Sequence, residues 1–256
     1  MNILKIQPNI ETKKIVTFMQ KTLKRENIRH VVIGVSGGID STTSLFLLAN
    51  AFPKEHIFPV HLYFFAPQKK TIEMITKKAG IPKENLTFLS IKNPVHTFQL
   101  SLHVSIEEKI RLGNIMARTR MIMLYDLAKK YRALVCGTEN KSEYFLGYFT
   151  RFGDEASDIE PLRHLYKAQV YQLAKFLNVP KEIITQEPSA GLWHGQTDEE
   201  EFGFSYKDAD QVLYLYFEKN KSVDEIGKMG FENAEKIIDW TKLVDFKHHT
   251  PYILSS

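Results

Sequence analysis

His30-VVIGVSGGIDSTTSLFLLAN-Ala51 is the segment from which the architecture of this chain can be read. Its β-branched start predicts a strand, the small residues predict a tight loop, and the leucine-rich end predicts a helix. In that arrangement free backbone N–H groups and the positive end of the helix dipole favour phosphate oxygens above the loop. Gly37 and Gly38 carry no Cβ, so the main chain can approach such a ligand closely.

The loop lacks the usual nucleotide-binding signatures, because no lysine follows the glycines as in a Walker A loop and no G-x-G-x-x-G occurs. It carries Asp40 instead. A carboxylate beside phosphates is repelled unless a cation bridges them, so Asp40 implies a divalent metal next to a polyphosphate. The alternative is a plain strand-to-helix turn in which Asp40 and Ser41 only cap the helix. The strand-loop-helix context favours phosphate binding.

Composition is that of an ordinary globular protein, with 256 residues, 43% hydrophobic and 25% charged. One catalytic domain over 1–256 fits it, with an N-terminal helix in 1–30, a nucleotide-binding α/β core in 31–165 and a helical part in 166–256. The net charge of +4, without a Lys/Arg block, is weak support for nucleic acid, and we expect no nucleic-acid partner.

Cys136 is the only cysteine and lies in an apolar run, so we expect a buried core residue without an internal disulfide. Neither a Cys/His cluster nor an HExxH motif predicts zinc, and no G-x-S-x-G elbow predicts a serine hydrolase. No segment resembles a signal peptide or reaches the roughly 18 apolar residues of a membrane span. We therefore expect a cytoplasmic protein without a membrane partner.

Further strands and helices alternate along the first half of the chain, which implies a parallel sheet with helices on both faces. The predicted strands are 57–65, 86–91 and 133–137, and the predicted helices are 10–26, 68–79 and one or two within 105–131. After Asp158 helical patterns dominate, at 167–177, 206–218, 222–228 and 231–246. The glycine-containing acidic segment 189–205 lacks periodicity and is predicted to be a lid loop.

Ligands of such sheets bind beyond the carboxyl ends of the strands, so the loops after Val35 and Cys136 should share one rim. That placement brings Thr138 and Glu143 near Asp40. The second loop is rich in carboxylates, which repel one another unless metals or cationic groups neutralise them. These carboxylates are Glu139, Glu143, Asp154, Glu155 and Asp158. The alternative is a solvated acidic loop.

Two basic positions are candidates for an anionic ligand. Asn114 and Arg118 lie four residues apart on one helical face, although Arg118 and Arg120 also fit exposed helix positions. Lys167 opens a predicted helix, where a cation opposes the helix dipole. That local cost indicates that Lys167 serves something anionic.

Residues 36–41, SGGIDS, resemble the pyrophosphate-binding loop of the N-type ATP pyrophosphatases, which cleave ATP between the α and β phosphates and adenylate a substrate oxygen. Six further strings, in order, resemble the NAD synthetases and cover most of residues 31–251. They are LGNIMARTRM, CGTENKSEYFLGYFTRFGDEASDIEPL, Lys167, QEPSAGL, QTDEEEFGFSY and FKHHTP.

This resemblance implies an α/β fold of the adenine nucleotide alpha hydrolase type, doubly wound, with a mostly parallel five-stranded sheet and a helical C-terminal part. It also implies a homodimer. The implied reaction is the amidation of deamido-NAD by ammonia, with ATP as co-substrate and Mg²⁺ as cofactor, giving NAD, AMP and pyrophosphate through an adenylated carboxylate. Free ammonia is the expected donor, because glutamine-dependent versions carry a further amidase domain with a nucleophilic cysteine.

By position, the resemblance assigns a role to each of several residues. Asp40, Asp154 and Lys167 are catalytic, with Asp154 orienting or deprotonating ammonia, and Asp40 and Glu143 hold Mg²⁺. The ATP-binding residues are Gly34, Val35, Ser36, Gly37, Gly38, Ile39, Asp40, Ser41, Thr138, Lys167 and Ser189. Those for deamido-NAD are Arg118, Arg151, Asp158 and Lys247. The chain departs from the family pattern with Arg151 for lysine, Phe246 for histidine and Ser189 for threonine.

Two other functions fit parts of this pattern. Another N-type ATP pyrophosphatase, GMP synthetase-like or tRNA-modifying, predicts basic RNA-binding patches or a nucleophilic thiol system, and neither is evident. A regulatory module that senses ATP without turnover does not require Asp40, Glu143, Asp154 and Lys167 around one polyphosphate. Pyrophosphate release with and without deamido-NAD separates the three functions.

Overall fold

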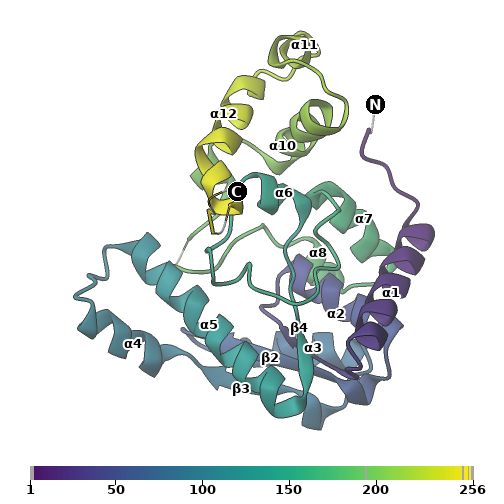
Figure 1. Ribbon diagram of the computed structural model, residues 1–256, viewed down its shortest axis with the longest axis vertical. Coiled ribbons are helices and arrows are strands. Elements are labelled where there is room, and N and C mark those ends of the chain that lie inside the picture. Colours follow the sequence, from purple (N-terminus) through teal and green to yellow (C-terminus); the bar gives the residue numbers. More distant parts are fainter. Residues whose placement is uncertain (1–2, 194, 250, 253, 255–256) are drawn as a thin grey trace.

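A four-stranded parallel sheet lies at the centre of the computed structural model, which describes residues 3–193, 195–249, 251–252 and 254 (Figure 1). Its strands are β1 (His30–Gly34), β2 (Ile57–Tyr63), β3 (Thr87–Ser90) and β4 (Ala133–Cys136), in the order β3-β2-β1-β4. The register pairs Val32 with Phe58 of β2 and with Val135 of β4. The connection after β1 leads to β2 on one side, whereas β4 on the other side of β1 is reached from β3, so the topology switches between β1 and β4.

Both faces of the sheet are covered by helices because the side chains of β1 alternate between two apolar clusters. Val31 and Ile33 pack with residues of α1, α2, α3, α7 and α8, whereas Val32 packs with residues of α4 and α5. These helices are α1 (Pro8–Arg25), α2 (Ile39–Ala51), α3 (Lys69–Lys78), α4 (Lys92–Ser101), α5 (Lys109–Tyr131), α7 (Lys167–Phe176) and α8 (Lys181–Ile184). Short 3-10 turns, η1 (Lys54–His56) and η2 (Lys83–Asn85), precede β2 and β3. The predicted doubly wound α/β fold is therefore confirmed.

The sheet has four strands in the described residues, one fewer than expected. At the place of a fifth strand, Ile159 forms a single parallel bridge with Cys136. Two local features stop the ladder there. The Asp158 carboxylate accepts the N–H of Val135 at 2.8 Å, and the following Pro161 has no N–H to donate.

The C-terminal part is helical, as predicted, and builds a third apolar cluster beyond the sheet, in the upper part of Figure 1. Its elements are α9 (Asp198–Phe202), α10 (Tyr206–Leu213), the π-helical turn η3 (Tyr214–Glu218), α11 (Val223–Lys228), α12 (Ala234–Val244) and η4 (Asp245–His248). The short α6 (Lys141–Phe145) contacts α10 and joins this cluster to the sheet. Helix α4 was not anticipated from the sequence, and 105–131 forms one long helix from Lys109 onward.

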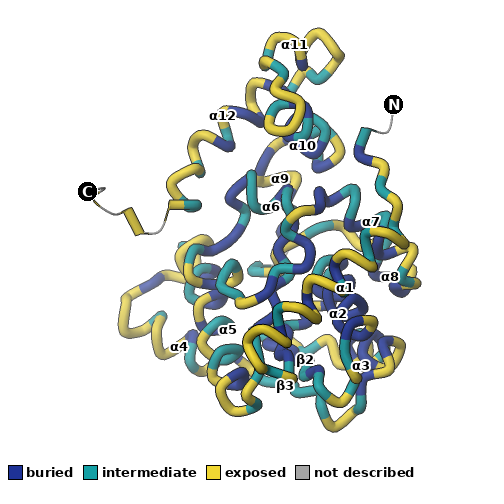
Figure 2. The backbone as a smooth tube through the Cα atoms, turned by 45° about the vertical axis from the view of Figure 1, so that its right-hand side comes forward, coloured by how far each residue is buried: buried dark blue, intermediate teal, exposed yellow. Residues whose placement is uncertain are grey.

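Buried residues concentrate around the strands and α2, while α4 and α11 are largely exposed (Figure 2). Cys136 is buried, as predicted for a core residue. None of the helices in the described ranges combines the length and the apolar character that a bilayer crossing needs.

Candidate active site

The loop after β1 is held in shape by its own hydroxyl groups. The Ser41 hydroxyl accepts the N–H of Ser36 at 3.2 Å and contacts the Ser36 hydroxyl at 3.0 Å. Gly37 has φ +95°, a conformation that side-chain-bearing residues rarely adopt. The N-cap residue of α2 is Gly38, and no side chain caps the helix there. The interpretation of Asp40 as only a helix cap is therefore wrong. Asp40 lies in the first turn of α2 with its carboxylate directed elsewhere.

The Asp40 carboxylate meets Lys167 and Glu143 at the switch between β1 and β4. The Lys167 ammonium donates to Asp40 Oδ2 at 2.7 Å and to Glu143 Oε1 at 3.0 Å. Asn140, which follows β4, donates its amide to Asp40 Oδ1 at 2.9 Å. The prediction that the two loops bring Glu143 near Asp40 is confirmed.

Burial gives this group unusual electrostatics. The Lys167 side chain is 3% exposed, and those of Asp40 and Glu143 are each 16% exposed. Burial opposes the charge on Lys167, but Asp40 and Glu143 outweigh it and raise the pKa of the ammonium. Burial raises the pKa of Glu143 to about 8, although the Lys167 ammonium works against that shift. A buried cation held by two acidic groups is suited to stabilising negative charge on a ligand.

Lys167 is positioned by residues of three helices, α6, α7 and α10. Its backbone N–H donates to the Ser142 hydroxyl at 2.9 Å, and the next N–H, of Ala168, donates to Asp210 Oδ2 at 2.7 Å. The Ser142 hydroxyl also donates to Asp210, which is fully buried in α10. Burial raises the pKa of Asp210 to about 6. Asp210 therefore connects the start of α7 to the C-terminal cluster.

Neither Asp210 nor Asn140 was recognised from the sequence as part of this site. Asn140 had a local signal, because Asn140 and Glu143 form the N-x-x-E pattern of a capping box, which α6 contains. Asp210 had none, since an acidic residue among apolar helix positions looks like an ordinary exposed position.

A second group of predicted residues lies around the loop between α6 and residue 155. The Arg118 guanidinium donates to the Arg151 carbonyl at 3.2 and 3.1 Å, and the Lys247 ammonium donates to the carbonyls of Gly147 and Phe149. Asp154 closes the same loop, since its Oδ1 accepts the N–H of Thr150 at 2.8 Å. The structure thus brings Arg118 of α5 and Lys247 of η4 onto the loop that carries Arg151 and Asp154.

Within this group the two departures from the family pattern touch each other, because the Arg151 guanidinium lies 5.6 Å from the centroid of the Phe246 ring. Asp158 does not join this group, because its carboxylate accepts the backbone N–H of Val135 in β4. Arg118 is exposed, as expected for a helix surface position. For Arg120 that expectation is wrong, because its partly buried guanidinium donates to the Leu62 carbonyl at the end of β2 at 3.2 Å.

Thr138 lies on the predicted rim, two residues beyond the end of β4. Ser189 is exposed and accepts the N–H of Gly191 at 3.1 Å. The predicted lid, 189–205, contains α9 and is tied down by Asp198, which accepts the N–H of Ala190 and the hydroxyl of Tyr206, each at 3.1 Å. The Lys167 ammonium lies 5.1 Å from the Tyr206 ring centroid, so the lid is linked to the charged group. Residue 194 of the lid and residue 250 lie outside the described residues.

The Asp40–Glu143 pair offers hard oxygen ligands, which suit Mg²⁺ when phosphates and waters complete its shell. No cluster of three or more His, Cys, Asp or Glu side chains fit to hold a metal occurs in the described part of the chain. A fit for Mg²⁺ therefore depends on ligands that the substrate brings.

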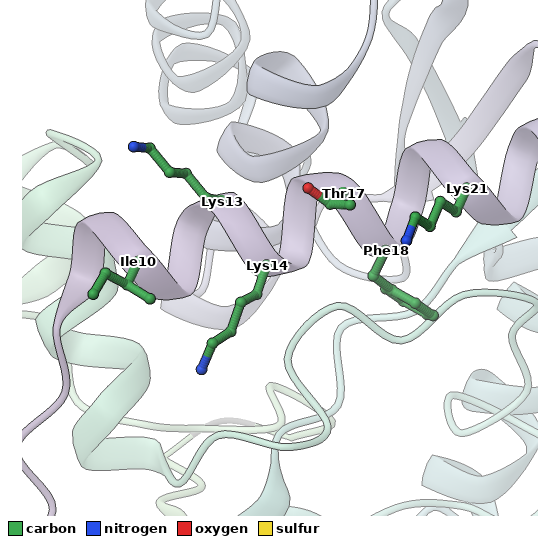
Figure 3. Close-up of a pocket in the computed structure, with 6 residues that line it drawn as sticks. All are labelled: Ile10, Lys13, Lys14, Thr17, Phe18 and Lys21. Carbon is green, nitrogen blue, oxygen red and sulfur yellow. The ribbon is translucent and has the colours of Figure 1, made fainter.

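The open hollow along α1, lined by Ile10, Lys13, Lys14, Thr17, Phe18 and Lys21 (Figure 3), contains none of the predicted residues.

Comparison with known proteins identifies the family. The model of the family described as NAD synthase matches residues 11–251. The chain belongs to the NAD synthase family.

Curated relatives agree with this assignment to the NAD synthase family. The NH(3)-dependent NAD(+) synthetase of Thermoplasma acidophilum is 39% identical over 251 residues, 95% of this chain and 97% of the relative. That of Pyrococcus furiosus is 39% identical over 240 residues, 93% of this chain and 91% of the relative.

Solved structures have the same fold. An NMN synthetase from Francisella tularensis has a TM-score of 0.83 at 32% identity, covering 98% of this chain and 100% of that one. The NH3-dependent NAD synthetase from Campylobacter jejuni, in complex with the nitrate ion, has a TM-score of 0.80 at 26% identity with the same coverage.

Proposed function

We propose that this protein uses ATP and ammonia to amidate deamido-NAD, giving NAD, AMP and pyrophosphate. Membership of the NAD synthase family supports the reaction, and relatives of nearly the same length carry the name NH(3)-dependent NAD(+) synthetase. The observation that carries the proposal is the Lys167 ammonium held between Asp40 and Glu143 beside the loop after β1.

The chemistry requires activation because a free carboxylate has only oxide as its leaving group. Transfer of AMP from ATP to the nicotinate carboxylate provides a good leaving group and releases pyrophosphate. The glycine loop and the first turn of α2 hold the phosphates through backbone N–H groups. Mg²⁺ held by Asp40 and Glu143 supplies neutralisation of phosphate charge when it is bound.

Lys167 stabilises the charge that develops on the phosphates during this transfer. It is suited to the task because it is buried, charged and fixed in place before substrate arrives, which avoids reorganisation in the transition state. Asp40 and Glu143 would hold the metal when it is bound, and the Lys167 ammonium would then contact a phosphate oxygen. Gly34 to Ser41, Thr138 and Ser189 complete the proposed ATP site.

Deamido-NAD lies, in this proposal, against the loop that gathers Arg118, Arg151 and Lys247, whose charges suit a dinucleotide diphosphate. Asp158 contacts the substrate with the carboxylate oxygen that does not accept the N–H of Val135. Asp154 orients or deprotonates the ammonia that attacks the adenylated carboxylate.

The proposal includes a homodimer in the cytoplasm. Exposed apolar side chains on and just before α5 support a subunit interface, since Ile106, Ile110 and Ile122 are 75%, 74% and 53% exposed. A second candidate substrate is the corresponding mononucleotide acid, because the Francisella neighbour is an NMN synthetase.

The test is incubation with ATP, Mg²⁺, ammonium and deamido-NAD, followed by measurement of NAD and pyrophosphate. We expect both products in equal amounts and only when the dinucleotide acid is present. Parallel reactions with nicotinate mononucleotide measure the second candidate. Pyrophosphate release without a nicotinate substrate, or no NAD, contradicts the proposal.

A further inference from the structure

A buried carboxyl group without a hydrogen-bond donor lies beside the proposed ATP site. Glu139, in the loop after β4, is 6% exposed, and neither of its carboxylate oxygens has a hydrogen-bond partner among the described residues. The cation paired with it is Arg163, whose Nη1 lies 3.4 Å from Glu139 Oε2 and whose side chain is 36% exposed. Buried polar groups normally have hydrogen-bond partners, so the lack of one at this carboxyl group indicates that it binds a ligand.

Glu160 lies next to Glu139, and hydrogen bonds fix its carboxylate in place. Its carboxylate accepts the backbone N–H of Glu139 at 3.2 Å and the Ser157 hydroxyl at 2.7 Å. A Cβ at Gly137 would lie 1.9 Å from Glu160 Oε1, so only glycine lets this carboxylate rest against the loop. The Glu139–Glu160 pair is therefore built into the end of β4.

Both carboxyl groups are costly to ionise where they lie. Burial raises the pKa of Glu139 to about 9, with Arg163 opposing the shift and the charges of Glu160, Glu143 and Asp154 adding to it. Burial raises the pKa of Glu160 to about 7, again with Arg163 opposing and Asp154 adding to the shift. Burying two acidic groups here lowers the stability of the folded protein, which indicates that the pair is kept for function.

We propose that Glu139 and Glu160 form a capture site for ammonium, the cation that brings the nitrogen of the reaction. The inference rests on the proposed function, since ammonia is its nitrogen donor. Ammonium is compact and carries N–H donors, which the unsatisfied oxygens of Glu139 need. Mg²⁺ fits less well, because it dehydrates reluctantly and demands octahedral geometry.

The pair also performs the deprotonation that ammonium needs before it can attack. Ammonium binds the ionised form of Glu139, so the proton that this buried carboxyl group holds is first released to solvent. One N–H bond of ammonium then breaks, its proton forms an O–H bond on the Glu139 carboxylate, and the electron pair stays on nitrogen as neutral ammonia. The acid later releases that proton to solvent. The charge of Asp154, the residue proposed to orient or deprotonate ammonia, acts on both glutamates.

Glu139→Gln tests the proposal, because glutamine keeps the shape of the side chain and cannot ionise when ammonium binds. At saturating ATP and deamido-NAD we expect the KM for ammonium to rise by about tenfold or more, the loss of one charged hydrogen bond. The KM values for ATP and deamido-NAD stay unchanged. Hydroxylamine, which is neutral at pH 7.5, replaces ammonium as nucleophile in the same assay, and its KM stays the same in the variant.

Glu160→Gln provides a second test, with a smaller rise in the same KM, and Glu187→Gln is the control for loss of an exposed carboxylate. Potassium, a cation of similar size, competes with ammonium in the native protein and not in Glu139→Gln. Thermal melting is expected to rise for Glu139→Gln, which shows that the variant folds.

Two results overturn the inference: an unchanged KM for ammonium in both glutamine variants, or an equal rise for hydroxylamine. Absence of NAD formation by the native protein instead overturns the proposed function.

Discussion

Lys167→Met removes the ammonium from between Asp40 and Glu143 and keeps the length of the apolar stem. The substitution leaves the two carboxyl groups, each 16% exposed, without the cation that pairs with them. Breaking a buried ion pair from one side costs about 3 kcal/mol or more in free energy of unfolding. Loss of preorganised charge stabilisation is expected to lower kcat by about 10²- to 10³-fold.

The variant also separates the two roles given to the carboxylates. Lys167 competes with any metal for Asp40 and Glu143, so removing it should strengthen Mg²⁺ binding in the absence of ATP. We expect Mg²⁺ to raise the melting temperature of Lys167→Met more than that of the native protein, which calorimetry or fluorescence melting measures.

Lys141→Met is the matched control, because Lys141 forms an ion pair with Glu218 in which the side chains are 23% and 37% exposed. Such a pair contributes less than about 1 kcal/mol, so stability and Mg²⁺ response should barely change. If Mg²⁺ leaves the melting temperature of Lys167→Met unaltered, the competition between Lys167 and the metal is refuted, because Asp40 and Glu143 then do not bind Mg²⁺ without the phosphates of ATP.

Three further outcomes are expected. Gly37→Ala places a Cβ in a backbone of φ +95°, which costs about 1 kcal/mol and should raise the KM for ATP; native-like stability and KM would contradict the role of this turn. The Glu139 pKa is raised from 4.5 to about 9 in the folded state. Between these pH values the folded protein binds one proton that the unfolded chain does not, so the free energy of unfolding falls as pH rises from 5 to 9. Glu139→Gln should flatten that decline in melts across pH, and an unchanged slope would show that Glu139 does not titrate there. Asp154→Asn should slow NAD formation from ammonia about 100-fold while ATP binding persists, and a full amidation rate would remove its role.

Local sequence was sufficient for the parts of the site that depend on neighbours along the chain. Residues 30–51 form the predicted strand, loop and helix because β-branched residues, glycines and leucines specify them locally. The approach of Glu143 to Asp40 was also predictable, since parallel strands end at one edge. Lys167 gave a weaker signal, a cation placed against a helix dipole.

Tertiary structure alone revealed the partners and the burial of these groups. Lys167 meets Asp40 across 127 residues of sequence, and Asp210 reaches the start of α7 from a helix that looks ordinary in the sequence. The missing fifth strand depends on a side chain, Asp158, taking a backbone N–H. In the sequence Glu139 also fitted a solvated acidic loop and Glu160 was not singled out, yet the fold buries Glu139 and packs Glu160 against Gly137. Chain order specifies local conformation, whereas desolvation and charge pairing depend on which distant segments pack together, and these set the chemistry of the site.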